Sequence, residues 1–113
     1  MITQIILILH NIRSVHNVGS IFRTADATGV SKIYLVGHTP APIDRFGRRR
    51  KDFAKVALGA EDTVLWEESK GVLELIKNLK KQKFHIVSVE LSEKSIDYRK
   101  IKKTEKICFI FGS

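Results

Sequence analysis

The sequence is poor in the features on which secreted and membrane proteins depend. It has a single cysteine, Cys108, so no disulfide can form within the chain, and it has no Asn-x-Ser/Thr glycosylation site. Its apolar runs, such as residues 5–9, are far shorter than the roughly 20 residues that cross a bilayer, and we expect no cleaved signal segment. These absences exclude a disulfide-built scaffold and predict a cytoplasmic protein without a membrane anchor.

Two kinds of binding site are missing as well. The sequence has no GxGxxG turn, so neither a Rossmann-type dinucleotide site nor a common Rossmann methyltransferase has any support in it. Its histidines show no metal-ligand spacing with a cysteine or with a pair of carboxylates. The four are His10, His16, His38 and His85. We therefore interpret them as structural or surface residues and expect no metal site.

What the chain does have is enough apolar residues for a core and a surplus of positive charge. Of its 113 residues, 43% are hydrophobic, which suits one globular domain over residues 1–113. Lysine and arginine together number 20 against 12 acidic residues, so the formal net charge is +8. A charge of this size favours a polyanionic partner, and nucleic acid is the first candidate.

Short apolar runs alternate along the chain with stretches of helical period. Four apolar runs predict strands, and they lie at residues 5–9, 33–36, 84–89 and 107–111. The first two are typical of strands buried on both faces. A weaker strand is predicted at 62–66, helices at 17–28 and 68–82, and a long loop at 37–52. This alternation predicts an α/β domain: a mostly parallel sheet with flanking helices, whose ligands bind beyond the carboxyl ends of the strands.

The helix predicted at residues 17–28 has a signal at each end. Asn17 suits the N-cap, because its side-chain oxygen can accept an otherwise unpaired backbone N–H. Gly29 suits the left-handed residue just past the C-terminus. Between them the apolar side chains gather on one face, and Arg23 falls on the solvent-facing side.

Three segments carry a resemblance to a known family. Residues 10–30 read HNIRSVHNVGSIFRTADATGV, residues 55–61 read KVALGAE, and residues 109–113 read FIFGS. The first resembles the first motif of the SpoU/TrmH branch of the SPOUT RNA methyltransferases, and the last resembles the opening of the second motif. Enzymes of this family transfer a methyl group from S-adenosylmethionine to a ribose 2′-hydroxyl. The resemblance covers essentially the whole chain and implies a SPOUT-like, Rossmann-related fold.

The resemblance implies that Asn17 and Arg23 are the active-site pair. In the family the arginine is assigned to activation of the ribose hydroxyl, and Asn17 would orient the arginine or the target nucleotide. Arginine is always protonated in proteins, so it is a poor general base unless a phosphate relays the proton. We expect Arg23 instead to hold its positive charge beside the developing alkoxide and the adjacent phosphate.

The resemblance also assigns the cofactor site, which in the family is a pocket made by a trefoil knot. The matching positions here are Glu90 and Leu91, after the strand predicted at 84–89, and Gly112, after the last strand. In the family FGS is followed by a Glu, a Gly and later a Ser-Leu-Asn motif that closes the knot, and these 113 residues do not contain them. We therefore expect the chain alone to be inactive and the complete protein to be a homodimer with a shared active site.

A basic segment is the candidate RNA contact. Its five cations are Arg45, Arg48, Arg49, Arg50 and Lys51. They could contact several phosphates of a tRNA or an rRNA, and the flanking Phe46 and Phe53 could stack on a base. Two alternatives remain open: a truncated, non-catalytic RNA-binding module, and a basic α/β interaction protein that binds no RNA.

Overall fold

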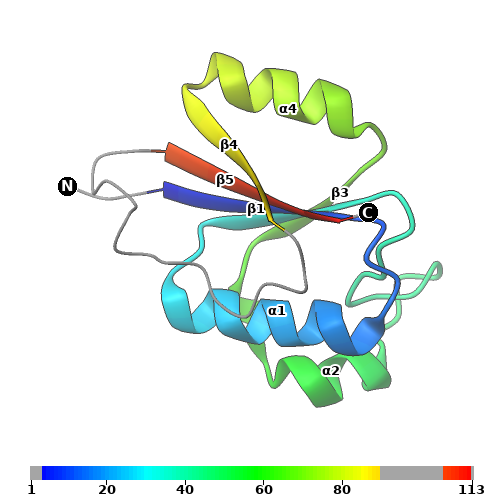
Figure 1. Ribbon diagram of the computed structural model, residues 1–113. Coiled ribbons are helices and arrows are strands. Elements are labelled where there is room, and N and C mark those ends of the chain that lie inside the picture. Colours follow the sequence, from blue (N-terminus) through cyan, green and yellow to red (C-terminus); the bar gives the residue numbers. More distant parts are fainter. Residues whose placement is uncertain (1–3, 90–105, 113) are drawn as a thin grey trace.

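The computed structural model describes residues 4–89 and 106–112 (Figure 1). Its five strands form one parallel sheet in the order β3-β2-β1-β5-β4. The strands are β1 (Gln4–His10), β2 (Lys32–Val36), β3 (Trp66–Ser69), β4 (Phe84–Val89) and β5 (Lys106–Gly112). The helices are α1 (Val15–Thr28), α2 (Lys51–Ala57), α3 (Ala60–Thr63) and α4 (Val72–Lys81). The predicted α/β class with a mostly parallel sheet is confirmed.

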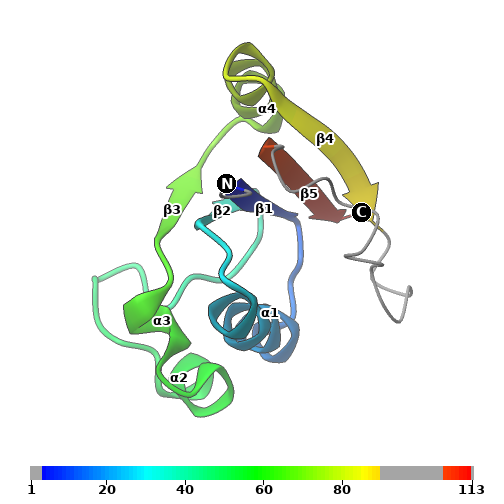
Figure 2. The same ribbon diagram turned by 90° about the vertical axis from the view of Figure 1, so that its left-hand side faces the viewer.

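Helices cover the sheet on both faces, with α1, α2 and α3 on one side and α4 on the other (Figure 2). Strand pleating divides the core accordingly. In β1, Leu7 and Leu9 pack toward α1, whereas Ile6 and Ile8 pack toward α4. All four are less than a tenth exposed. Burial on both faces explains why this strand is a continuous apolar run and not an alternating one.

The four strongly apolar strands lie where they were predicted, to within a residue at each end. The other elements show where the pattern was misinterpreted. The weak strand predicted at 62–66 is β3 at Trp66–Ser69, which pairs in parallel with β2, and α3 occupies Ala60–Thr63. The helix predicted at 68–82 consequently begins only at Val72. The predicted loop ends at Arg50, because α2 begins at Lys51.

The start of α1 corrects a second prediction. Asn17 is not the N-cap: Ser14 has extended backbone angles, and its Oγ accepts a hydrogen bond from the Asn17 backbone N at 3.1 Å. Asn17 therefore lies in the first turn, which leaves its side chain available for other contacts. At the other end Gly29 is left-handed, with φ of 76°, as predicted.

Gly19 also lies inside α1, where it brings a second helix close. A Cβ on this residue would lie 3.0 Å from the Val56 Cβ and 3.4 Å from the Ala57 backbone N, both in α2. Such separations are tighter than most side-chain contacts, so the absence of a side chain at Gly19 sets the distance between α1 and α2.

Among residues 4–89 and 106–112, no helix is long and apolar enough to cross a membrane.

Cys108 offers a test of this core. The residue is fully buried in β5, and burial raises the pKa of its thiol from 9.0 to about 12. The thiol should therefore stay protonated and unreactive, since the thiolate is the nucleophile. We expect iodoacetamide at about pH 8 to leave the folded protein unlabelled and to alkylate Cys108 in denaturant, as followed by mass spectrometry. Equal labelling of the folded and unfolded protein would contradict this burial.

Candidate active site

The candidate site is built at the edge of the sheet where the parallel strands end. After β1 the chain reverses at Asn11, which is left-handed with φ of 55°. The Asn11 Oδ1 accepts a hydrogen bond from the His38 backbone N at 2.8 Å, and the Asn11 backbone N donates to the Val36 carbonyl at 3.1 Å. These bonds fasten the turn after β1 to the turn after β2.

A buried threonine, Thr39, completes this fastening. Its Oγ1 accepts a hydrogen bond from the Ile12 backbone N at 3.2 Å. The same oxygen lies 2.9 Å from the Leu9 carbonyl and 2.8 Å from the Val36 carbonyl, to either of which it can donate. Thr39 is not among the predicted site residues, because only its burial, at 8% exposure, distinguishes it from an ordinary loop threonine. The start of α1 and the loop after β2 thus share one support.

Helix α1 presents both predicted catalytic residues to solvent. Asn17 and Arg23 are exposed, and within the described residues neither side chain makes a hydrogen bond or an ion pair. They are six positions apart in the helix, a rise of about 9 Å along the axis. The structure therefore does not show Asn17 orienting Arg23 directly. It does leave the Arg23 guanidinium with its donors free for a substrate.

Gly112 is the one predicted cofactor residue that the structure describes, since Glu90 and Leu91 lie outside the described residues. It ends β5 opposite His10 of β1. A Cβ on Gly112 would collide with the His10 carbonyl oxygen and lie 3.1 Å from the His10 Cβ. Glycine thus lets the two strand ends stay paired and keeps exposed backbone at this edge. This arrangement fits a ligand that lies against the ends of the strands.

The basic segment folds as a small hairpin over residues 43–49, held around Asp44. Ile43 and Arg49 form an antiparallel bridge, and Gly47 takes a left-handed conformation with φ of 77°. The Asp44 Oδ1 accepts hydrogen bonds from the backbone N of Phe46 and of Arg48, each at 2.9 Å. In Figure 1 the loop after β2 lies at the same edge of the sheet as the start of α1 and the end of β5.

Three of the five predicted RNA-binding cations are held by carboxylates. Arg48 Nε bonds Asp44 Oδ2 at 3.0 Å, and Arg50 pairs with Asp52 at 2.8 Å. The pKa of Asp44 is lowered by the backbone N–H groups of Arg48 and Phe46 and by the Arg48 side chain. The pKa of Asp52 is lowered by the Arg50 side chain and the Phe53 backbone N–H. Among the described residues, Arg45 and Lys51 are in no ion pair. The segment is therefore less strongly cationic than its sequence suggests.

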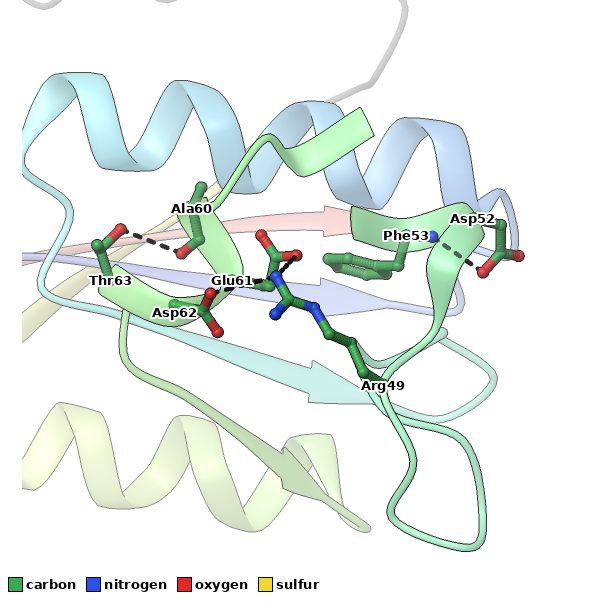
Figure 3. A network of polar contacts seen from close by, with 7 residues as sticks. All are labelled: Arg49, Asp52, Phe53, Ala60, Glu61, Asp62 and Thr63. Atoms are coloured by element: carbon green, nitrogen blue, oxygen red, sulfur yellow. Dashed lines mark hydrogen bonds and ion pairs between the residues drawn. The ribbon is translucent and has the colours of Figure 1, made fainter. Parts of the chain in front are cut away.

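Arg49 is paired with two carboxylates at once (Figure 3). Its guanidinium lies 3.2 Å from both Glu61 Oε2 and Asp62 Oδ2, which come from α3. The Glu61 side chain is only 3% exposed, and its other oxygen, Oε1, is buried with no hydrogen-bond partner. A buried carboxylate needs a compensating cation. Arg49 thus anchors the hairpin to α3.

The two phenylalanines beside the arginines have opposite positions. Phe46 is at the hairpin tip and is 67% exposed. Phe53 is fully buried in α2, and its ring meets the Phe22 ring edge to face at a centroid distance of 5.1 Å. The prediction that Phe53 could stack on a base is wrong, because the residue belongs to the core between α1 and α2.

Acid should loosen the hairpin. Hydrogen bonds from the Arg48 backbone N, the Phe46 backbone N and the Arg48 side chain lower the pKa of Asp44 below its ordinary 3.8. A carboxyl whose pKa is lower in the folded hairpin stabilises it above pH 3.8 and loses that contribution as the pH falls through the lowered value. NMR titration should show the Phe46 and Arg48 amides shifting together with the Asp44 carboxyl. In an Asp44→Asn variant this common titration should vanish; amides that do not respond to Asp44 would contradict the role assigned to it.

A hollow of about 480 Å³ lies elsewhere, between α4 and the β2–β3 side of the sheet. Its lining includes Tyr34, Glu67 and Glu74, and none of the predicted site residues. In the described residues, no three His, Cys, Asp or Glu side chains gather where they could hold a metal ion. The predicted site residues that the structure describes lie on α1, at the end of β5 and in the segment after β2, and none of them lines this hollow.

Known proteins resemble this chain over nearly all of its length. A tRNA (guanosine(18)-2′-O)-methyltransferase of Escherichia coli strain K12 is 29% identical over 104 residues, which is 92% of this chain and 42% of that protein. An rRNA methyltransferase from Sinorhizobium meliloti superposes with a TM-score of 0.73 at 27% identity, covering 96% of this chain and 39% of that one.

A crystal structure of an AdoMet-bound rRNA methyltransferase from Sinorhizobium meliloti gives a TM-score of 0.74 at 24% identity. It covers 97% of this chain and 40% of that one, and at this identity it shows a shared fold. The chain thus spans about two fifths of the length of these relatives. The sequence profile of the SpoU rRNA methylase family matches residues 4–113. The chain belongs to the SpoU rRNA methylase family.

Proposed function

We propose that the full-length protein containing this chain is an S-adenosylmethionine-dependent ribose 2′-O-methyltransferase that acts on tRNA or rRNA. The observation that carries the proposal is Arg23: it lies in the family's first motif, exposed on α1, with no partner among the described residues. The similar proteins are named as tRNA and rRNA methyltransferases, which supports RNA as the substrate.

In this proposal the residues of the chain mainly position the reactants. S-adenosylmethionine supplies a sulfonium-activated methyl group, so little covalent help is required from the protein. Arg23 holds its charged fork beside the ribose oxygen as negative charge develops and beside the neighbouring phosphate. Asn17, in the first turn of α1, contacts the target nucleotide. Such alignment alone can lower a barrier substantially.

The cofactor is placed at the ends of β4 and β5. Gly112 is exposed there and keeps the strand ends paired, which supports its assignment. Glu90 and Leu91 follow β4 in sequence and complete the proposed set. The assignment of all three rests on the family resemblance, with Gly112 as its structural support.

RNA contact is proposed at the hairpin over residues 43–49 and at Lys51. Arg45 and Lys51 contribute charge that no described carboxylate neutralises, whereas Arg48, Arg49 and Arg50 contribute mainly by holding the hairpin and the start of α2 in place.

We also propose a homodimer, in which the exposed Arg23 is accessible to a site that a second copy completes. A free, buried cysteine suits the proposed cytoplasmic location.

Methyl transfer tests the proposal directly. The full-length protein is incubated with labelled S-adenosylmethionine and unmodified tRNA or rRNA, and modified ribose is located by resistance to alkaline cleavage, which requires a free 2′-hydroxyl. We expect label at one nucleotide and none in an RNA carrying 2′-deoxyribose there. Label on a base would overturn the proposed reaction, and RNA binding without methyl transfer would favour the non-catalytic alternative.

A further inference from the structure

We propose that the hairpin tip formed by Arg45, Phe46 and Arg48 is a stacking site for an unpaired RNA base. The inference rests on the proposed function and narrows it, since it names the kind of RNA that the hairpin selects: a loop or single strand, and not a continuous duplex. It is carried by the exposure of Phe46, the two cations around its ring and the rigidity of the turn that presents it.

The turn is held in place before any RNA arrives. Backbone hydrogen bonds add to those that the Asp44 side chain accepts. The Asp44 backbone N donates to the Arg48 carbonyl at 2.8 Å, and the Gly47 backbone N donates to the Asp44 carbonyl at 3.0 Å. At the base of the hairpin the Arg50 backbone N bonds the Pro42 carbonyl at 2.9 Å. Together with the anchor of Arg49 on α3, these bonds reduce the entropy lost when a ligand binds.

The aromatic ring at the tip is open and flanked by charge. Phe46 is 67% exposed, so the cost of leaving this ring in water is not offset by packing within the described chain. The Arg45 guanidinium lies 4.9 Å from the ring centroid and the Arg48 guanidinium 5.0 Å. Because both guanidinium groups lie over the ring, a base would stack on the part of the ring that they leave exposed or on the plane of a guanidinium. Arg45, which is in no ion pair among the described residues, supplies donors for a neighbouring phosphate, whereas Arg48 is held by Asp44.

This chemistry suits an unpaired base better than other partners. In an A-form duplex the faces of the bases are covered by their neighbours, so a ring at a hairpin tip cannot stack on them. In loops and single strands the bases are available, and stacking on aromatic rings tolerates any sequence. The charge beside Phe46 matches the phosphate that accompanies every base.

The test compares two RNA probes on the full-length protein. One is an oligouridylate carrying a single 2-aminopurine, and the other is a blunt-ended duplex of the same length. With Phe46→Ala we expect binding of the single strand to weaken at least about 5-fold and the quenching of 2-aminopurine to disappear, with duplex affinity and its salt dependence unchanged. Phe46→Trp should restore both binding and quenching.

Leu65→Ala is the matched control, because Leu65 is as exposed as Phe46, at 68%. Its carbonyl accepts a hydrogen bond from the Ile33 backbone N near the start of β2, whereas the hairpin follows the end of β2. If wild-type protein binds RNA and Phe46→Ala binds the single strand equally well, the stacking site is overturned while the proposed function stands. Equal weakening of both probes, or a preference of the tip for polyglutamate over RNA, would also overturn it. If the wild-type protein binds no RNA at all, the proposed function fails first.

Discussion

An Arg23→Ala variant of the full-length protein is expected to lose methyl transfer by about 10²-fold to 10³-fold while it keeps its fold. The guanidinium is proposed to act on charge that develops only in the transition state, so kcat should fall while KM changes little. Folding should be spared, because Arg23 is exposed and has no hydrogen bond or ion pair within the described residues. Initial rates with saturating cofactor, together with the melting temperature, measure both expectations.

Two further variants sharpen this prediction. Arg23→Lys keeps the charge but loses the planar fork, so we expect an intermediate rate. Lys77→Ala removes an exposed cation from α4, on the opposite side of the sheet, and should leave the rate unchanged. Full activity of Arg23→Ala would move the chemistry to another residue. A loss of activity that parallels a lowered melting temperature would make Arg23 a structural residue.

A Phe53→Ala variant is expected to lose about 3–5 kcal/mol of unfolding free energy. Phe53 is fully buried, and its ring contacts Phe22 edge to face across the α1–α2 interface. Truncation would leave a cavity beside the helix that carries Arg23. Domains have a net stability of only about 5–15 kcal/mol, so this single change should remove a large part of that stability. Urea denaturation followed by circular dichroism measures the loss.

Phe46→Ala is the natural comparison, because the same side chain is removed from an exposed position. We expect its unfolding free energy to lie within about 0.5 kcal/mol of the wild-type value. Phe53→Leu, which keeps part of the buried volume, should fall between the two. Equal stabilities of the Phe53→Ala and Phe46→Ala variants would contradict the burial of Phe53 between α1 and α2.

The strands could be predicted where burial produces a continuous apolar run in the sequence. β1, β2, β4 and β5 lie in or beside the core and carry apolar runs. β3 could not be placed, because Glu67 and Glu68 are exposed and only Trp66 of this strand packs against the core, so it carries no apolar run. Its identity comes from pairing with β2, a tertiary contact that local composition does not encode.

The cations near residue 50 show a similar limit to what the sequence predicts about the candidate site. Their number and spacing indicated RNA binding, but the sequence does not say which of them are neutralised. The partners of Arg49 lie 12 and 13 residues further along, in a short helix that the pattern did not reveal. The sequence also does not distinguish the exposed Phe46 from the buried Phe53. Phe53 is buried because it lies in helix α2, whose seven residues begin immediately after the arginines.

The shared support at Thr39 has a consequence for substrate choice. One side-chain oxygen binds the segment that enters α1 and the segment that leads to the hairpin, so the two cannot easily move apart. An RNA stacked at Phe46 and methylated at Arg23 would therefore meet two points at a fixed separation. A protein with both proposed sites would select a ribose by its distance from an unpaired base, and the sequence of the nucleotides between them would matter less than the span they cover.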